Sequence, residues 1–123
     1  MNRLRVDRLC GPPAPLVAGD GTVLAARCYR ASSVPARLVG LLGTPDLAGD
    51  EALWLEPCGS VHAVLLRAPI GCAFLDSESR VLRVVDPLRR GRAAAARGAR
   101  AVVECRAGVL AGIAPGTRLE RRS

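Results

Sequence analysis

The feature that most constrains the fold is the alternation of short apolar runs with clusters of Gly, Pro, Asp and Ser. The cluster Gly19-Asp20-Gly21 separates two such runs, and Asp76-Ser77-Glu78-Ser79 separates another two. These residues accept the positive φ angles of tight turns, so each cluster between apolar runs predicts a β-hairpin. The chain is therefore expected to be rich in strands that pair with their neighbours.

Further strands are predicted from apolar content and alternation. In Ala99–Cys105, apolar residues alternate with Arg100 and Glu104, although Val102 falls on the polar side. The stretch Arg89–Gly98 is expected to be an exposed loop or a frayed helical turn. The other short elements expected are strands at 52–55, 61–66 and 117–119 and one helical turn at 109–113.

One segment has the pattern of a helix, at about residues 33–42. Ser32 or Ser33 can cap its first turn, and a proline early in a helix costs no hydrogen bond. Gly43 is suited to the left-handed residue that follows a helix. The apolar residues of this segment fall on one helical face: Val34, Leu38, Leu41 and Leu42.

These elements together predict an α+β fold that is mostly β, an antiparallel sheet or barrel-like domain with the 33–42 helix packed on it. Residues 1–14 end in Gly11-Pro12-Pro13 and are expected to form a flexible leader, and residues 15–120 a single β-rich domain. Because Trp54, Tyr29 and Phe74 are the only aromatic residues, the core must consist mainly of Val, Leu, Ile and Ala.

The charge and the cysteine content indicate a cellular compartment but do not indicate a metal site or another binding site. The net charge is +7, yet all 18 basic residues are Arg, a bias typical of GC-rich coding sequences. The five cysteines are odd in number and show neither zinc-ligand spacing nor a C-x-x-C motif. Charged residues interrupt the N-terminal segment, and no apolar run approaches the roughly 20 residues that span a bilayer. We therefore expect a cytoplasmic protein with free thiols, without metal, cofactor or membrane contact.

Several short motifs, in order, resemble a known family. The resemblance covers roughly Val23 to Leu119 and is to the small prokaryotic proteins of domain of unknown function one-hundred-and-ninety-two, also called the uncharacterised ACR family. It implies a compact β-rich domain with one principal helix and no established activity. The motifs are Gly40-Leu41-Leu42-Gly43, Pro57-Cys58-Gly59-Ser60-Val61-His62, Leu66-Arg67-Ala68-Pro69-Ile70, Phe74-Leu75-Asp76, Val102-Val103-Glu104-Cys105-Arg106-Ala107-Gly108 and Pro115-Gly116.

The chain departs from the family pattern at polar positions. Where members commonly have His-Thr, Met-Arg and Pro-Ile-Asp, this sequence has His62-Ala63, Leu66-Arg67 and Pro69-Ile70-Gly71. The imidazole and the guanidinium are kept, whereas the acid is replaced by Gly71. A family function that used this acid would be lost here.

The densest polar chemistry is the segment from Cys58 to Arg67. On an extended segment Ser60 and His62 share a face, and Cys58 joins them if the alternation continues through Gly59. A thiol beside an imidazole is the minimum for a nucleophile and its base. However, His62 is the only histidine, so a structural role for Cys58 and His62 is favoured over a catalytic one. Too few ligands are available for zinc.

Three functions of different classes follow. The first is a non-enzymatic accessory or small-ligand-binding domain, whose partner is a small anionic ligand or a protein. Its binding residues would be Ser60, His62, Arg67 and Glu104, the last as the acidic partner of Arg67. The second is a Cys58–His62 enzyme or redox protein. The third is a nucleic-acid-associated protein using the Arg cluster between Arg89 and Arg106, which lacks the stacking aromatics of single-strand binders and is not favoured.

Overall fold

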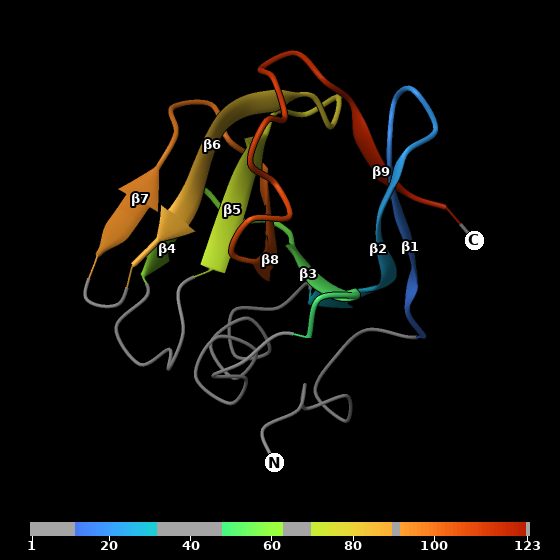
Figure 1. Cartoon of the computed structure of the whole chain (residues 1–123). Helices are drawn as coiled ribbons and strands as arrows, with labels where there is room; N and C mark the ends of the chain where they lie inside the picture. Colours follow the sequence, from blue (N-terminus) through green and yellow to red (C-terminus); the bar gives the residue numbers. More distant parts are fainter. Residues whose placement is uncertain (1–11, 32–47, 63–69, 90–91, 123) are drawn as a thin grey trace.

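The computed structural model describes residues 12–31, 48–62, 70–89 and 92–122, and every regular element in these ranges is a strand (Figure 1). For Ala31 and for 60–62 only the backbone is described. The strands are β1 (Ala14–Ala18), β2 (Val23–Ala31), β3 (Glu51–Leu55), β4 (Ser60–His62), β5 (Ile70–Leu75), β6 (Val81–Leu88), β7 (Ala93–Ala95), β8 (Ala101–Arg106) and β9 (Leu119–Arg121).

Seven of these strands form one mixed sheet in the order β6-β5-β8-β3-β2-β1-β9. The two predicted hairpins are present as the antiparallel pairs β1–β2 and β5–β6. Strands β2 and β3 pair in parallel, with Cys28 opposite Ala52, and the other neighbours are antiparallel. Strands β4 and β7 form a separate two-stranded ribbon.

The sheet curls until its two edge strands meet. The residue before β6, Arg80, bridges the residue before β9, Arg118. Around this bridge Val81 N donates to Thr117 O at 2.8 Å, and Leu119 N donates to Ser79 O at 3.0 Å. The resulting curled sheet has an inner face, which its own strands enclose, and an outer face.

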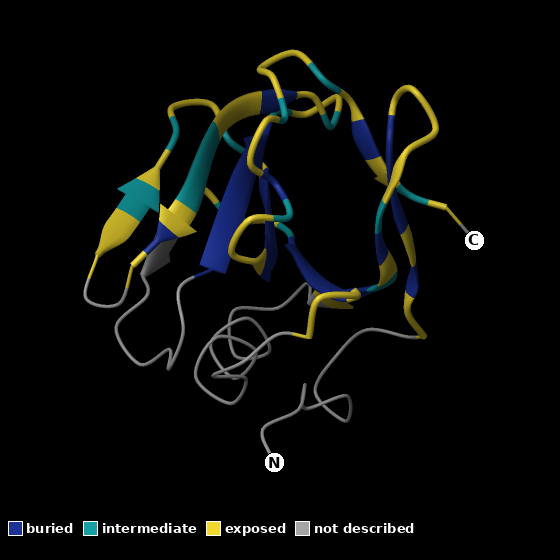
Figure 2. Cartoon of the chain, in the orientation of Figure 1, coloured by how far each residue is buried: buried dark blue, intermediate teal, exposed yellow. Residues whose placement is uncertain are grey.

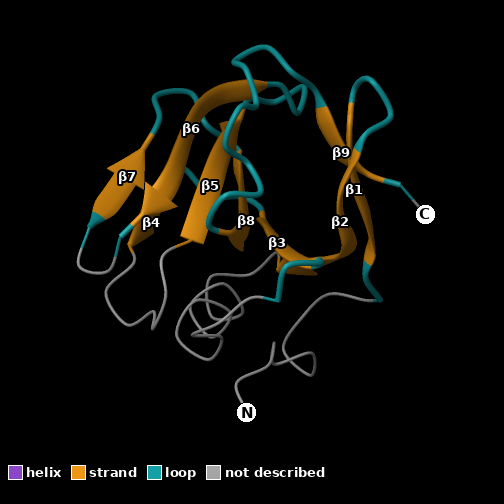
Figure 3. Ribbon diagram, viewed as in Figure 1, coloured by secondary structure: helices purple, strands orange, loops and turns teal. Residues whose placement is uncertain are grey.

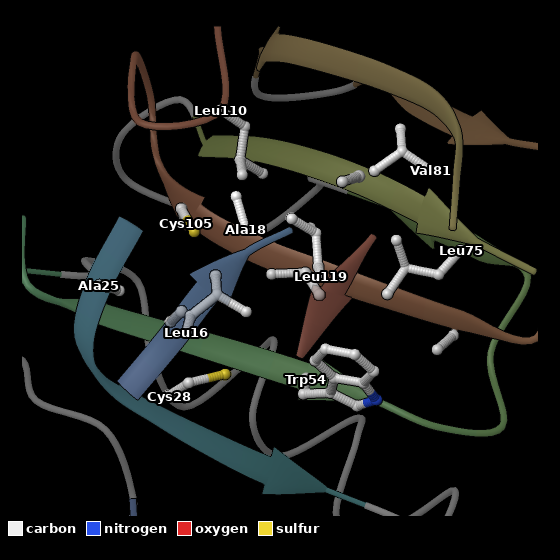
Figure 4. Packing of buried hydrophobic residues seen from close by; sticks show 14 residues of the cluster. Leu16, Ala18, Ala25, Cys28, Trp54, Leu75, Val81, Cys105, Leu110 and Leu119 are labelled. Atoms are coloured by element: carbon white, nitrogen blue, oxygen red, sulfur yellow. The ribbon is translucent and has the colours of Figure 1, made fainter. Parts of the chain in front are cut away.

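The inner face holds the larger hydrophobic cluster. Its side chains come from both edge strands and from the strands between them. Side chains of strands so far apart in the sheet can meet only on the enclosed face. Leu16, Leu119 and Trp54 pack against one another from β1, β9 and β3 (Figure 4). Burial of such side chains contributes about 1.5–3 kcal/mol each, so this cluster is a main source of stability.

A second cluster lies on the outer face and includes Tyr29, Phe74 and Val102. Strands β3 and β5 are buried along their whole length (Figure 2) because both of their faces carry a cluster. This explains why, apart from Glu51 at the start of β3, their sequences are continuous apolar runs rather than alternating ones.

The α+β class predicted from the sequence is wrong. Strands alone make up the regular structure of the described residues (Figure 3), and the fold is mostly β, in a mixed sheet rather than an antiparallel one. The predicted principal helix at 33–42 lies outside the described residues, and so does most of the predicted leader. The antiparallel expectation failed because only hairpins have a local sequence signal, whereas the parallel β2–β3 pair joins strands that are distant in sequence.

Two further expectations are corrected. Residues 93–95, which were expected to lie in an exposed loop or a frayed helical turn, form strand β7, and residues 109–113 form bends and turns without a helix. Alanine favours helices, but here Ala93–Ala95 pair with Ser60–His62, and tertiary pairing outweighs a preference of a fraction of a kcal/mol per residue.

Candidate ligand-binding site

Glu104, predicted as a binding residue, is buried on the outer face of the curled sheet, with 2% of its surface exposed. Its strand neighbours are Cys72 of β5 and Leu53 of β3, both members of the outer-face cluster. Its Oε2 atom has no hydrogen-bond partner among the residues that the structure describes. Burial disfavours the charged form and raises the pKa of Glu104 to about 8, so the carboxyl is largely neutral at pH 7.

Cys58 lies at the other end of β8. Its backbone N donates to Arg100 O at 3.0 Å, and its partly buried side chain packs against the outer-face cluster. Arg100 is four residues from Glu104, or about 13 Å along an extended strand. Cys58 and Glu104 are therefore not brought together.

The other predicted site residues are only partly covered by the structure. Ser60 and His62 lie in β4, where they pair with Ala95 and Ala93, so the backbone of His62 belongs to a different sheet from Glu104. The side chains of Ser60 and His62, and all of Arg67, lie outside the described residues. The Cys58–His62 and Arg67–Glu104 contacts stay predictions.

A carboxylate does occupy the space beside Gly71, where the family pattern has an acid. A Cβ added to Gly71 would lie 2.6 Å from Cγ of Asp86 on the neighbouring strand. Asp86 Oδ1 accepts the N–H of Gly108 at 2.8 Å, and Oδ2 accepts that of Leu110 at 3.0 Å. Asp86 thus ties the turn after β8 to β6, and Gly71 leaves room for it.

A pocket with concentrated polar chemistry lies at the ends of β2 and β3, beside the β5–β6 turn and β9. It encloses about 270 Å³ and is called here the Trp54 pocket. Trp54 is 7% exposed and belongs to the inner-face cluster, with its ring nitrogen turned away from that cluster (Figure 4). The lining residues are Arg30, Trp54, Glu56, Ser79, Glu120 and Arg121.

Hydrogen bonds position the polar groups of the Trp54 pocket. Trp54 Nε1 donates to Glu56 Oε1 at 3.0 Å, and Arg30 Nη2 lies 3.9 Å from the same oxygen. Arg121 Nε donates to Cys28 O and its Nη2 to Pro12 O, both at 3.0 Å. The pocket therefore combines an indole with two cations and two anions.

A larger hollow of about 440 Å³ lies between the β1–β2 turn and residues 112–118. The charged residues of its described lining are Asp20 and Arg118, and Asp20 Oδ1 already accepts the N–H of Thr22 at 2.9 Å. Binding sites combine apolar walls with a few convergent polar groups. The larger hollow has the more apolar walls, but four charged side chains converge in the Trp54 pocket, and this convergence makes it the better candidate despite its smaller volume.

The predicted Arg cluster is exposed but not neutralised by acids. Arg89, Arg92, Arg97, Arg100 and Arg106 are all exposed. The acids nearest in sequence are Asp86, which binds backbone amides, and Glu104, which is buried. This part of the molecule presents positive charge to solvent.

The described residues contain no group of three or more His, Cys, Asp or Glu side chains that could hold a metal ion. Within the same ranges no helix is long and apolar enough to cross a membrane.

Sequence reasoning missed the Trp54 pocket because its residues come from four separate segments. One local signal was present: Trp54 and Glu56 are two residues apart at the end of an apolar run. Residues at this spacing on an extended chain point to the same side, which brings the indole N–H to the carboxylate.

Two solved structures share the fold. A candidate transcription regulator from Sinorhizobium meliloti has a TM-score of 0.76 and 18% identity, with 92% of this chain and 95% of that chain covered. A protein of unknown function from Novosphingobium aromaticivorans has a TM-score of 0.73 and 22% identity, with coverage of 88% and 83%. At these identities the likeness establishes the fold alone. No curated protein matches the chain.

The family comparison agrees with the motifs of the sequence. The model of the DUF192 family, described as uncharacterized ACR, matches residues 16–121, from β1 to the end of β9. The match takes in the curled sheet, the ribbon and every lining residue of the Trp54 pocket. The chain belongs to this family of uncharacterized proteins.

Proposed function

We propose that this chain is a non-enzymatic, small-ligand-binding domain of a prokaryotic cytoplasm, and that its ligand occupies the Trp54 pocket. The observation that carries the proposal is a buried indole beside four charged side chains in one cavity. Apolar area for contact and polar groups for orientation are the two requirements of a small-molecule site. The Trp54 pocket meets the polar requirement with four charged side chains on strands or next to them, and its apolar contact is limited to the exposed edge of Trp54.

The electrostatics of the pocket support binding rather than covalent chemistry. None of its lining residues in the described part of the chain is a cysteine or histidine, and Oε1 of Glu56 accepts the Trp54 N–H. A nucleophile would need an adjacent base to activate it, and the lining offers Ser79 without such a partner among the described residues.

The experiment uses Trp54 as its own probe, because it is the only tryptophan in the chain. Purified protein is titrated with a panel of small anions, cations, zwitterions and neutral metabolite-like compounds while tryptophan emission is recorded. Saturable change at ligand concentrations up to about 1 mM, a binding free energy near −4 kcal/mol, is the expected result. A panel without any saturable response, and without a rise in melting temperature, contradicts the proposal.

A second candidate function is association with nucleic acid through the exposed Arg cluster. It is favoured by six exposed arginines among the described residues from Arg83 to Arg106, a stretch in which no described acid is exposed. The description of the Sinorhizobium relative as a candidate transcription regulator agrees with it. Binding of this kind weakens linearly with log salt, so a DNA titration at several salt concentrations tests it. Loss of salt-dependent binding in Arg97→Gln/Arg100→Gln, but not in Arg122→Gln, would assign it to this stretch.

A further inference from the structure

The Trp54 pocket holds charges of both signs. Arg30 and Arg121 contribute two positive groups, and Glu56 and Glu120 two negative ones, of which Glu120 is also paired with Arg122 outside the lining. A simple anion entering the pocket would be attracted by the guanidinium groups but repelled by the carboxylates, and a simple cation would meet the reverse. A pocket of this composition favours a ligand that carries both signs.

Arg121 is held in place before any ligand arrives. Its two hydrogen bonds to Cys28 O and Pro12 O use Nε and Nη2, and Nη1 makes no hydrogen bond within the described residues. A side chain already ordered in this way loses little conformational entropy on binding. Arg121 can therefore present one N–H group of a fixed guanidinium to a carboxylate.

Glu56 is oriented by the indole. Its Oε1 accepts the Trp54 N–H, whereas its Oε2 makes no hydrogen bond within the described part of the chain. The Arg30 guanidinium, at 3.9 Å, lies at the limit of an ion pair, with both side chains partly exposed. Such a loose pair contributes little by itself, so Glu56 Oε2 and Arg30 can each take a ligand group of opposite charge.

The size of the pocket limits the ligand further. Its volume of about 270 Å³ is just below the range of about 300–1,000 Å³ of pockets for drug-sized molecules. Only 7% of Trp54 is exposed, and its N–H edge is turned toward Glu56, so the pocket offers a ligand mainly polar contacts.

From this geometry we propose that the ligand of the Trp54 pocket is a small zwitterion of the α-amino-acid class. Its carboxylate is bound by Arg121 and Arg30, and its ammonium is bound by Glu56. This inference rests on the proposed function and names the ligand class of the same pocket.

Matched ligand series test the inference. Phenylalanine is compared with phenylpropionate and phenethylamine, and leucine with isocaproate and isoamylamine, by calorimetry and Trp54 emission. In at least one series the zwitterion is expected to bind tenfold or more tightly than both of its singly charged analogues. Equal binding of the acid overturns the zwitterion assignment but leaves the ligand-binding function standing. If none of the six compounds binds but another compound of the wider panel does, the zwitterion assignment is likewise overturned and the ligand-binding function stands. Failure of every compound overturns both.

A single variant assigns the ammonium site. Glu56→Gln keeps an oxygen that can accept the Trp54 N–H but removes the negative charge. The zwitterion is expected to lose its tenfold advantage in this variant, while the acid analogue binds as well as before or better. Glu78→Gln, an exposed acid on the adjacent turn but outside the pocket lining, is the control and should leave all affinities unchanged. An unchanged preference for the zwitterion in Glu56→Gln overturns the proposal.

Discussion

Asp86 fills the space that a side chain on Gly71 would need, and from there its carboxylate binds the backbone amides of Gly108 and Leu110. The missing side chain at position 71 and the acid at position 86 are thus one structural unit. In this chain the carboxylate stands on β6 at the place where the family pattern has an acid on β5.

This relationship predicts coupling between the two positions. Gly71→Ala should destabilise the fold by about 1–3 kcal/mol, because its methyl group would meet the Asp86 carboxylate. Asp86→Ala should cost a similar amount, since two amides lose a charged acceptor. The double variant should cost less than the sum of the two, because removal of the carboxylate makes room for the methyl group. Urea unfolding measures all three free energies.

Gly49→Ala is the control for this cycle, because a Cβ at Gly49 would meet nothing within 4 Å. Strict additivity of the two changes would show that Gly71 and Asp86 do not share this contact.

Glu104 should make stability depend on pH in an unusual direction. Its pKa is raised from 4.5 to about 8 by burial, so between these values the folded state binds more protons than the unfolded state. Stability contributed by the neutral carboxyl is therefore present at low pH, falls as pH rises through this window, and levels off above about pH 8. The slope cannot exceed about 1.4 kcal/mol per pH unit for one group.

The variant Glu104→Gln isolates this effect, because it keeps the shape and removes the titration. The difference between the free energy of unfolding of this variant and that of the wild type should increase steadily from pH 5 to pH 8. Any contribution of His62 is the same in both proteins and drops out of the difference. A difference that stays flat over the same range would mean that Glu104 is ionised in the folded protein.

The described cysteines should differ sharply in reactivity. Cys28, Cys72 and Cys105 are buried, and burial raises the pKa of each thiol, to about 12 for Cys28 and Cys72. Since the thiolate is the reactive form, these three should resist alkylation at pH 8 until the protein unfolds. Cys58 is only half-buried and should react first among the four. Alkylation followed by mass spectrometry reads each site separately.

The same assay tests the Cys58–His62 enzyme hypothesis. If His62→Ala removes a selective reactivity of Cys58 below pH 7, the imidazole activates the thiol. Equal reactivity of Cys58 in both proteins would remove the basis of that hypothesis.

The inner face of the curled sheet should be sensitive to cavities. Leu119 is fully buried between β9 and the interior cluster, so Leu119→Ala is expected to cost about 2–5 kcal/mol. Val23, at the start of β2, is 59% exposed, and Val23→Ala should change stability by no more than about 0.5 kcal/mol. Comparable losses in thermal unfolding would show that Leu119 does not pack as described.

What could be predicted from the sequence was local. The turns at 19–22 and 76–79 have the residues that their geometry requires, and both hairpins were predicted correctly. The parallel β2–β3 pair and the place of β8 between β5 and β3 have no local signal, since they depend on contacts between distant segments. The resemblance to the family, by contrast, was confirmed over nearly the whole chain.

The candidate site was predictable only in part. The sequence predicts Glu104 as the acidic partner of Arg67. Val102, which interrupts the polar side of the same strand, is consistent with the burial of that side in the structure. The Trp54 pocket assembles Arg30, Glu56 and Arg121 from separate strand ends, so no single stretch of sequence contains it.

The meeting of β6 and β9 bears on how the protein matures during its synthesis. Strand β9 is last in chain order, yet it pairs with β1 and its neighbour Arg118 touches the residue before β6. A nascent chain that has emerged only as far as β8 therefore has two open sheet edges and an apolar inner face without Leu119. Species of this kind are prone to aggregate. Residue 119 must be synthesised before the domain can cover its open edges and its apolar inner face. A chaperone would therefore matter most in the interval between the appearance of β8 and that of β9.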